Sequence, residues 1–234
     1  MRPLGALALA GLLAAVVSLV TPTVGLQAAR QATPDNLAGS ARVIDGDTLV
    51  VGDRRVRLEG MDAPEASQTC ASERGGSWDC GQVATRELAT LVAGKYVRCE
   101  SNETDKYGRA LAVCWIDNQE INAEMVRRGL AWAFVRYSSR LINAEADARK
   151  RGIGIWQASN EPAWAYRAGR WSTAENTAPA GCAIKGNITR TARTYHMPWN
   201  RSYEAVRINA SKGERWFCSE AEAMAAGWQP VRTN

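Results

Sequence analysis

Residues 41–58 read ARVIDGDTLVVGDRRVRL, and the fold prediction starts from their pattern of apolar and polar residues. Apolar residues alternate with polar ones on both sides of Gly52-Asp53, and two alternating runs joined by such a turn predict a β-hairpin. A second turn sequence, Asp45-Gly46-Asp47, precedes the first strand of this hairpin. The hairpin therefore has acidic side chains at one end and a basic residue, Arg57, on its second strand.

The next hundred or so residues predict further strands and three helices. Residues 96–99 and 110–116 predict two strands, because the turn-forming sequence Asp105-Lys106-Tyr107-Gly108 separates them. Helical periodicity occurs in residues 82–92, 122–128 and 141–151, and a glycine follows each of the first two segments. Strands with interleaved helices indicate a small mixed α+β barrel.

The composition is that of a globular protein, with 46% hydrophobic and 23% charged residues among 234. These proportions exclude an intrinsically disordered chain. The sequence has one histidine, His196, which excludes mechanisms that need a catalytic histidine together with a histidine ligand to a metal. The formal net charge is +5, and arginine supplies most of the positive charge, so the chain is suited to phosphate binding.

Residues 4–20 are an unbroken apolar run, and no charge follows Arg2 until Arg30. This pattern predicts an export signal over residues 1–28, with an uncleaved membrane anchor as the alternative. The sequence does not decide the cleavage point, since neither residues 23–25 nor residues 27–29 form a clean Ala-x-Ala site. We expect the protein to be exported, either secreted or periplasmic.

Six cysteines fit an oxidising compartment, and an even number in an exported chain predicts disulfides. Fifteen pairings are open from sequence alone. Neighbour pairing is the most economical, with free buried thiols as the alternative, and the absence of Cys-x-x-Cys disfavours zinc. The neighbour pairs are Cys70 with Cys80, Cys99 with Cys114, and Cys182 with Cys218.

The composition changes at residues 158–180, which are rich in Ser, Asn, Pro, Ala and Thr. We therefore predict a main domain over residues 38–170, a linker over 171–180 and an accessory module over 181–234. A module of about fifty residues is small enough to need its disulfide.

Four acidic residues lie near two predicted turns: Asp45, Asp47, Asp62 and Glu65. Clustered carboxylates suit a hard cation such as Ca²⁺, and Asp47 and Asp62 would share it if the two turns meet. Glu65 would lie beside the ion, where a carboxylate can take a proton from water. The alternative for Asp-Gly-Asp alone is a plain turn.

Two arginines, Arg57 and Arg109, complete this candidate site. Cationic groups near a metal and a base are what phosphodiester hydrolysis requires, because negative charge accumulates on the phosphate oxygens in the transition state. Taken alone, either arginine is better explained as a solvated surface residue than as a phosphate-binding residue. The combination predicts a phosphodiesterase.

Three separated motifs resemble those of the thermonuclease (staphylococcal nuclease-like) family. They are VIDGDT at residues 43–48, RLEGMDAPE at 57–65 and DKYGR at 105–109, with further support from VRRGLA at 126–131 and GIW at 154–156. The resemblance covers about residues 38–170. It implies an OB-fold, a five-stranded barrel, here with three helices.

The resemblance also implies Ca²⁺-dependent cleavage of single-stranded or loosened DNA and RNA to products with 3′-phosphate ends. Asp47, Asp62 and the Ala63 carbonyl would hold the ion, with Asp45 nearby. Glu65 would be the general base, and Arg57 and Arg109 would bind the scissile phosphate. Further substrate contacts are implied for Lys106 and Tyr107 near the terminal phosphate and for Tyr137 against a base.

The sequence departs from the family pattern in three places. The hairpin between Asp47 and Arg57 is short, an insert between Cys70 and Cys80 follows Glu65, and Val135 stands where the family has a second tyrosine. Substrate access and base stacking are therefore expected to differ, with Phe134 or Trp132 as substitutes for the missing ring.

Residues 181–234 resemble a small module appended to such domains in some bacterial proteins. We interpret His196 within it as structural. Two alternatives to a nuclease stay open from sequence: a non-catalytic barrel that binds nucleic acid or another anion, and a cell-envelope protein attached to surface polymers by this module. We expect a monomer without a protein partner.

Overall fold

The structure is a computed structural model that describes residues 35–231. The predicted export signal at residues 1–28 lies outside the described residues. Among the described helices, none has both the length and the apolar character needed to cross a bilayer.

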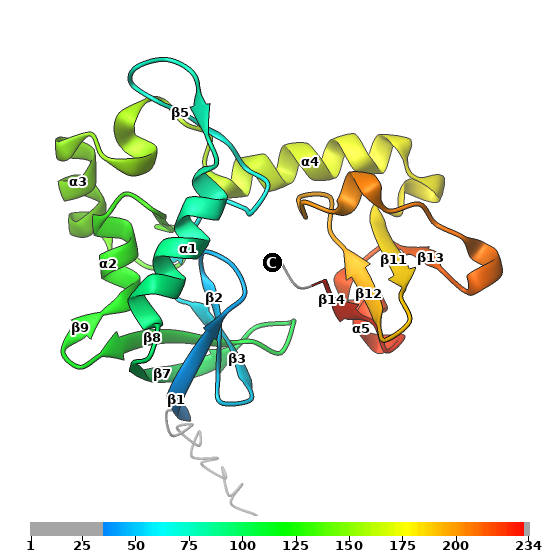
Figure 1. Cartoon of the computed structure of the whole chain (residues 1–234), viewed down its shortest axis with the longest axis horizontal. Helices are drawn as coiled ribbons and strands as arrows, with labels where there is room; N and C mark the ends of the chain where they lie inside the picture. Colours follow the sequence, from blue (N-terminus) through cyan, green and yellow to red (C-terminus); the bar gives the residue numbers. More distant parts are fainter. Residues whose placement is uncertain (1–34, 232–234) are drawn as a thin grey trace, which may run out of the picture. The chain divides into compact units, whose positions relative to one another are not determined.

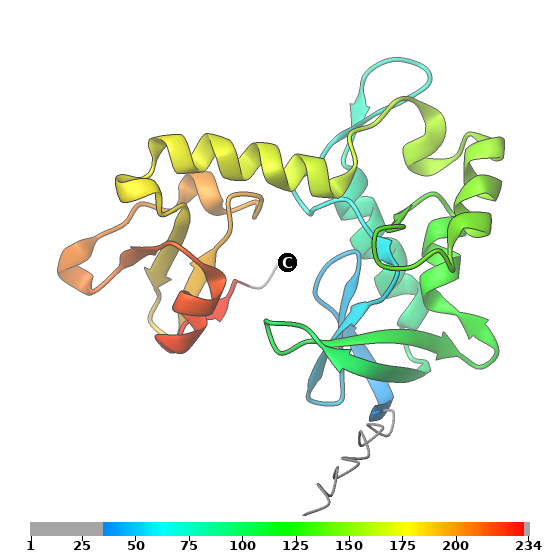
Figure 2. The ribbon, with the colours of Figure 1, turned by 180° about the vertical axis from the view of Figure 1, so that it is seen from behind.

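Five strands form a closed barrel, as predicted (Figure 1, and from behind in Figure 2). The order is β3-β2-β1-β7-β8, and a parallel pairing of β3 with β8 closes it. All the other neighbours in this barrel pair antiparallel. This architecture confirms the OB-fold class. The strands are β1 (Asp35–Val43), β2 (Thr48–Val51), β3 (Arg54–Leu58), β7 (Tyr96–Thr104) and β8 (Ala110–Ile116).

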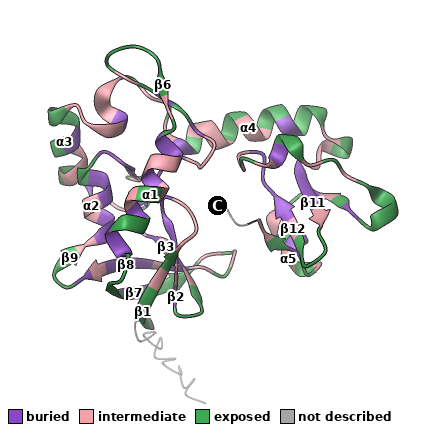
Figure 3. Cartoon of the chain, viewed as in Figure 1, coloured by how far each residue is buried: buried purple, intermediate pink, exposed green. Residues whose placement is uncertain are grey.

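The barrel interior follows from the alternation seen in the sequence. Every second residue of β8 is buried, from Ala110 to Ile116, because successive side chains of a strand point to opposite faces. Val56 and Leu58 of β3 and Leu49 of β2 point into the same core. Burial therefore follows a period of two along the strands (Figure 3).

The predicted helices are present with small differences in their ends. They are α1 (Cys80–Val92), α2 (Ile121–Arg127) and α3 (Ile142–Arg151). A further helix, α4 (Ala163–Thr177), begins after Pro162 and runs through the change in composition. Short strands and 3₁₀ turns complete this part: β4 (Met61–Asp62), β5 (Cys70–Ala71), β6 (Ser77–Trp78), β9 (Gln119–Glu120), β10 (Trp132–Ala133), Gly154–Gln157 and Pro179–Gly181.

Two residues of the α2 region make close contacts, one with the barrel and one with the segment after α3. The fully buried Asn122 side chain accepts from the Cys114 amide and donates to the carbonyls of Glu59 and Ala112, at 3.0, 2.9 and 3.1 Å. Gly129 lies against the backbone of Ile153, where an added Cβ would be 2.3 Å from the carbonyl oxygen. Only glycine fits this approach, because the obstacle is backbone and cannot move aside.

The structure confirms neighbour pairing of the cysteines. Cys99 and Cys114 are directly paired residues on β7 and β8 and form one bond. Cys70 and Cys80 join β5 to the start of α1, and Cys182 and Cys218 form the third bond.

The C-terminal residues form a separate sheet with its own core. Its order is β13-β11-β12-β14, and the core includes Tyr195, Phe217 and Trp228. His196 is buried, and its Nδ1 lies 2.8 Å from Ser202 Oγ. This contact supports the structural interpretation of His196. The elements are β11 (Ile184–Ile188), β12 (Arg193–His196), Tyr203–Ala205, Ala210–Lys212, β13 (Arg215–Phe217), α5 (Glu220–Ala225) and β14 (Gln229–Pro230).

Candidate active site

The two acidic turns meet, as the sequence predicted. Asp45 and Asp47 lie between β1 and β2, and the Ala63 amide of the second turn donates to Asp47 Oδ2 at 3.2 Å. A Cβ on Gly46 would lie 2.7 Å from the Ala63 Cβ, so the glycine allows the turns to approach. Within the first turn, the Asp47 amide donates to Asp45 Oδ1 at 3.1 Å.

Arg57 joins the two aspartates of these turns. From β3, its Nη1 donates to Asp47 Oδ1 at 2.5 Å and its Nη2 donates to Asp62 Oδ1 at 2.7 Å. Asp47 is 5% exposed and Asp62 is 0% exposed, so both carboxylates need these partners. One guanidinium therefore fixes the separation of the two carboxylates.

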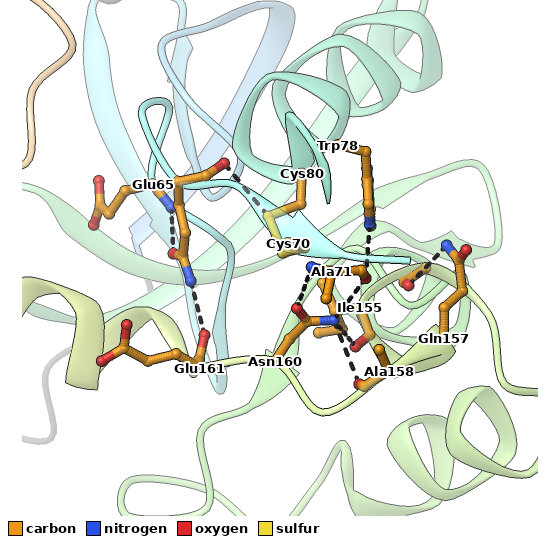
Figure 4. The surroundings of a disulfide bond; sticks show 12 residues. Glu65, Cys70, Ala71, Trp78, Cys80, Ile155, Gln157, Ala158, Asn160 and Glu161 are labelled. Atoms are coloured by element: carbon orange, nitrogen blue, oxygen red, sulfur yellow. Dashed lines mark hydrogen bonds between the residues drawn. A yellow bond between two sulfur atoms is a disulfide. The ribbon is translucent and has the colours of Figure 1, made fainter. Parts of the chain in front are cut away.

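Glu65 follows on the Asp62 turn and its backbone is anchored. Its amide donates to Gln68 Oε1 at 3.2 Å, and Gln68 Nε2 donates to the Glu161 carbonyl at 2.7 Å. Figure 4 shows this connection beside the Cys70–Cys80 bond. Gln68 thus ties the turn to the segment that leads into α4.

An arginine that sequence reasoning missed lies on the same carboxylates. Arg167 of α4 donates to Asp62 Oδ1 and Oδ2 at 3.1 and 2.8 Å, and to Glu65 Oε1 at 2.7 Å. The sequence carries no signal for this contact, because 105 residues separate Arg167 from Asp62 and no motif surrounds it.

The acidic cluster shifts the pKa values of its members. Burial raises the pKa of Asp45 to about 6, and the negative charge of Asp47 acts in the same direction. Burial also raises the pKa of Glu65 to about 8, although Arg167 opposes this shift. Burial opposes ionisation of Asp47 too, but Arg57, Arg109 and Arg167 outweigh it and lower the pKa of that carboxyl. Burial therefore favours the neutral form of Asp45 and Glu65, whereas the arginines favour the ionised form of Asp47.

Arg109 immediately precedes β8, the strand that pairs with the strand of Arg57. Arg57 on β3 is the register partner of Leu111 on β8, and Arg109 is two residues before Leu111, at the end of the turn that precedes β8. Arg109 Nε donates to Asp105 Oδ2 at 2.7 Å, while Asp105 Oδ1 accepts from the Tyr107 and Arg109 amides. The turn thus orients Arg109, whose charge acts on Asp47.

Comparisons with known proteins identify the family of this barrel. A family model described as "Staphylococcal nuclease homologue" matches residues 55–158. A succinoglycan biosynthesis protein, ExoI, of Rhizobium meliloti is 38% identical over 137 residues, which cover 57% of this chain and 72% of that protein. This chain belongs to the staphylococcal nuclease family.

Two further relatives have names that state an activity. An uncharacterized endonuclease of Haemophilus influenzae is 39% identical over 134 residues, covering 54% of this chain and 69% of the relative. A micrococcal nuclease of Shigella flexneri is 34% identical over 145 residues, which cover 54% of this chain and 77% of that protein. The predicted enzyme class, a thermonuclease-like phosphodiester hydrolase, is confirmed at the level of the family.

The donor groups of this nuclease site fit a hard cation. Asp47 and Asp62 offer carboxylate oxygens beside the backbone of Ala63, and all six cysteines are in disulfides. No three Asp, Glu, His or Cys side chains within residues 35–231 form a metal-binding group. Carbonyl oxygens and water would therefore complete a shell, as is usual for Ca²⁺.

The remaining predicted substrate residues lie on the surface. Lys106 is exposed, and its Nζ is 4.9 Å from the centre of the Tyr107 ring, which also lies under Arg109. Tyr137 is 71% exposed and meets Phe134 edge-to-face at 4.9 Å. Within the described residues, these three side chains form no hydrogen bond with the acidic cluster. Phe134 in turn stacks on Trp164 of α4 at 5.2 Å.

Proposed function

We propose that this nuclease is a Ca²⁺-dependent enzyme that hydrolyses single-stranded DNA and RNA and leaves 3′-phosphate ends. The observation that carries the proposal is the meeting of two aspartates, a glutamate and Arg57 at two adjacent turns. This combination supplies hard ligands, a base and a phosphate-binding cation in one place.

Asp47, Asp62 and the Ala63 carbonyl would hold the cation, with Asp45 supporting them. When bound, Ca²⁺ would supply positive charge that offsets the charge of the phosphate and of the cluster. The raised pKa values of Asp45 and Glu65 support this role, since a cation would favour the ionised carboxylates.

Glu65 is proposed as the general base. It takes a proton from water as the water oxygen attacks phosphorus, and the bond from phosphorus to the 5′ oxygen breaks. The leaving oxygen gains a proton and becomes a 5′-hydroxyl, while the phosphate stays on the 3′ side. The Gln68 contact to the Glu65 backbone would keep the carboxylate in position.

Arg57 and Arg109 are proposed to bind the scissile phosphate. Their guanidinium groups stabilise the charge that develops on the equatorial oxygens, and Arg109 assists the leaving oxygen. Lys106 and Tyr107 would contact a terminal phosphate next to Arg109, and Tyr137 would stack on a base.

We also propose that the protein is exported, either secreted or periplasmic. The apolar run at residues 4–20 supports this, and three disulfides are typical of chains in oxidising compartments. Fractionation of the source cells, with sequencing of the mature N-terminus, tests the proposal. Full-length protein in the cytoplasm would contradict it.

The test of the function is digestion of single-stranded DNA and RNA by purified protein, with CaCl₂ or with EGTA. Cleavage in Ca²⁺ only, with phosphate on the 3′ side, is the expected result. Retention of nucleic acid without cleavage in both conditions would favour a binding protein, and phosphate on the 5′ side would contradict the proposed chemistry.

A further inference from the structure

Arg167 is the residue of the site that neither the motifs nor the family model includes. The model match ends at residue 158, nine residues before Arg167. The Arg167 side chain is 20% exposed, and its guanidinium contacts both oxygens of Asp62 and one oxygen of Glu65. These are the carboxylates assigned above to cation binding and to proton transfer.

The start of α4 is held by Gln68, by β5 and by rings at β10, and these contacts fix where Arg167 lies. Asn160 accepts from the Ala71 amide at 2.7 Å, and Gln68 donates to the Glu161 carbonyl. Trp164 stacks on Phe134 and meets Trp132 edge-to-face at 6.2 Å. Arg167 is three residues after Trp164 and so lies on the same side of the helix.

The carboxylate oxygens in question are already used by protein donors. Asp62 Oδ2 accepts from Arg167, and Asp62 Oδ1 accepts from both Arg57 and Arg167. Asp47 accepts from Arg57 and from the Ala63 amide. Guanidinium N–H groups therefore take three of the roughly four lone-pair sites of the Asp62 carboxylate, so a cation that binds both Asp62 oxygens must displace a guanidinium contact.

We propose that Arg167 is a positioning residue that competes with the divalent cation for Asp62 and also holds the Glu65 carboxylate. It neutralises and orients the two carboxylates in the metal-free protein, and metal binding requires its guanidinium to withdraw. Arg167 therefore sets the metal concentration at which the site fills. This inference rests on the proposed function, because it assumes that a divalent cation is the cofactor.

The test is a calorimetric titration of the full chain with CaCl₂. We expect Arg167→Gln to bind Ca²⁺ with a Kd about tenfold lower than that of wild type, because a competing cation is gone. Arg167→Lys should give an intermediate Kd, since an ammonium keeps the charge but cannot bond both Asp62 oxygens as a fork. Arg170→Gln is the matched control on the same helix, where Arg170 pairs with Glu204.

Thermal unfolding gives a second readout that does not depend on activity. In EDTA, Arg167→Gln should unfold at a lower temperature than wild type, because Asp62 is fully buried and loses a partner. Saturating CaCl₂ should then raise the Tm of this variant more than that of wild type. An unchanged or higher Kd, with an equal rise in Tm, would overturn the inference.

The two proposals fail in distinguishable ways. If wild type cleaves DNA with Ca²⁺ but Arg167→Gln shows no gain in affinity, the role of Arg167 is wrong and the nuclease function stands. If Arg167→Gln gains affinity but neither protein cleaves nucleic acid, the competition stands and the proposed function fails.

Discussion

At the scale of single residues, the charged groups of this site depend on one another. Arg57 bridges Asp47 and Asp62, and the Asp62 turn leads directly to Glu65. The motifs predicted these four residues, because they are close in sequence within two turns. They did not predict Arg167, since long-range pairing depends on where α4 packs and leaves no local pattern.

We expect Arg57→Lys to lower kcat/KM for single-stranded DNA by about 10- to 1000-fold. A lysine keeps the charge, but its ammonium cannot hold two carboxylates and a phosphate in the geometry of a fork. Initial rates in CaCl₂ measure the effect, with Arg140→Lys as a surface control. Activity equal to that of wild type would contradict the role of the guanidinium.

The raised pKa of Glu65 predicts how stability depends on pH in the metal-free protein. The pKa is 4.5 ordinarily and about 8 in the fold, so between these values the folded state holds a proton that the unfolded state releases. Stability from this group is therefore present below pH 4.5 and is lost as the pH rises towards 8. Asp45 acts in the same direction between 3.8 and about 6.

Glu65→Gln should remove this pH dependence. Urea unfolding in EDTA measures the free energy of unfolding of both proteins at pH 5 and at pH 8. This free energy should change in favour of the variant, relative to wild type, as the pH rises from 5 to 8. If the difference in the free energy of unfolding between the two proteins is the same at pH 5 and at pH 8, Glu65 keeps its ordinary pKa.

At the scale of elements, periodicity predicted most of the barrel. The strands and the three helices α1 to α3 carry their apolar residues at the expected spacing. Helix α4 was missed because its moderately amphipathic sequence, AWAYRAGRWSTAENT, follows a proline and lies in a region whose composition indicates a boundary. Ring packing of Trp164 on the barrel stabilises this helix, and sequence periodicity does not report such packing.

Among the contacts between elements, we expect those of the Asn122 side chain to have the largest effect on the free energy of unfolding. Asn122→Ala should reduce the free energy of unfolding by about 2–4 kcal/mol, because a buried amide and buried carbonyls lose their partner. Chemical denaturation measures this change, and Asn118→Ala, at an exposed position, is the control. A loss no larger than that of the control would contradict the account of α2 docking.

At the scale of the whole molecule, the nuclease barrel and the C-terminal sheet have separate cores. The barrel core is formed by residues from the strands and several helices, whereas the C-terminal core contains fewer buried residues. The Cys182–Cys218 bond closes the smaller unit. Neighbour pairing is the most economical of the fifteen pairings that the sequence leaves open, and both cysteines of this pair lie in one predicted unit.

Removal of that bond should therefore affect the two units unequally. In Cys182→Ser/Cys218→Ser, limited proteolysis should cut residues 182–231 first, while the barrel persists and cleaves DNA. Loss of the bond should cost the C-terminal unit roughly 2–4 kcal/mol. Equal rates of digestion for both units would show that the bond does not carry this stability.

Asp47, Asp62, Arg57 and Glu65 lie at two adjacent turns, and we propose that they form one hydrolytic site. Single-turnover cleavage of single-stranded DNA by Glu65→Gln in saturating CaCl₂ tests it most directly, with Glu87→Gln as the control for loss of a surface carboxylate. We expect Glu65→Gln to be about 10²- to 10⁴-fold slower than wild type while remaining folded, and Glu87→Gln to be unchanged. A Glu65→Gln rate equal to that of wild type would contradict the claim.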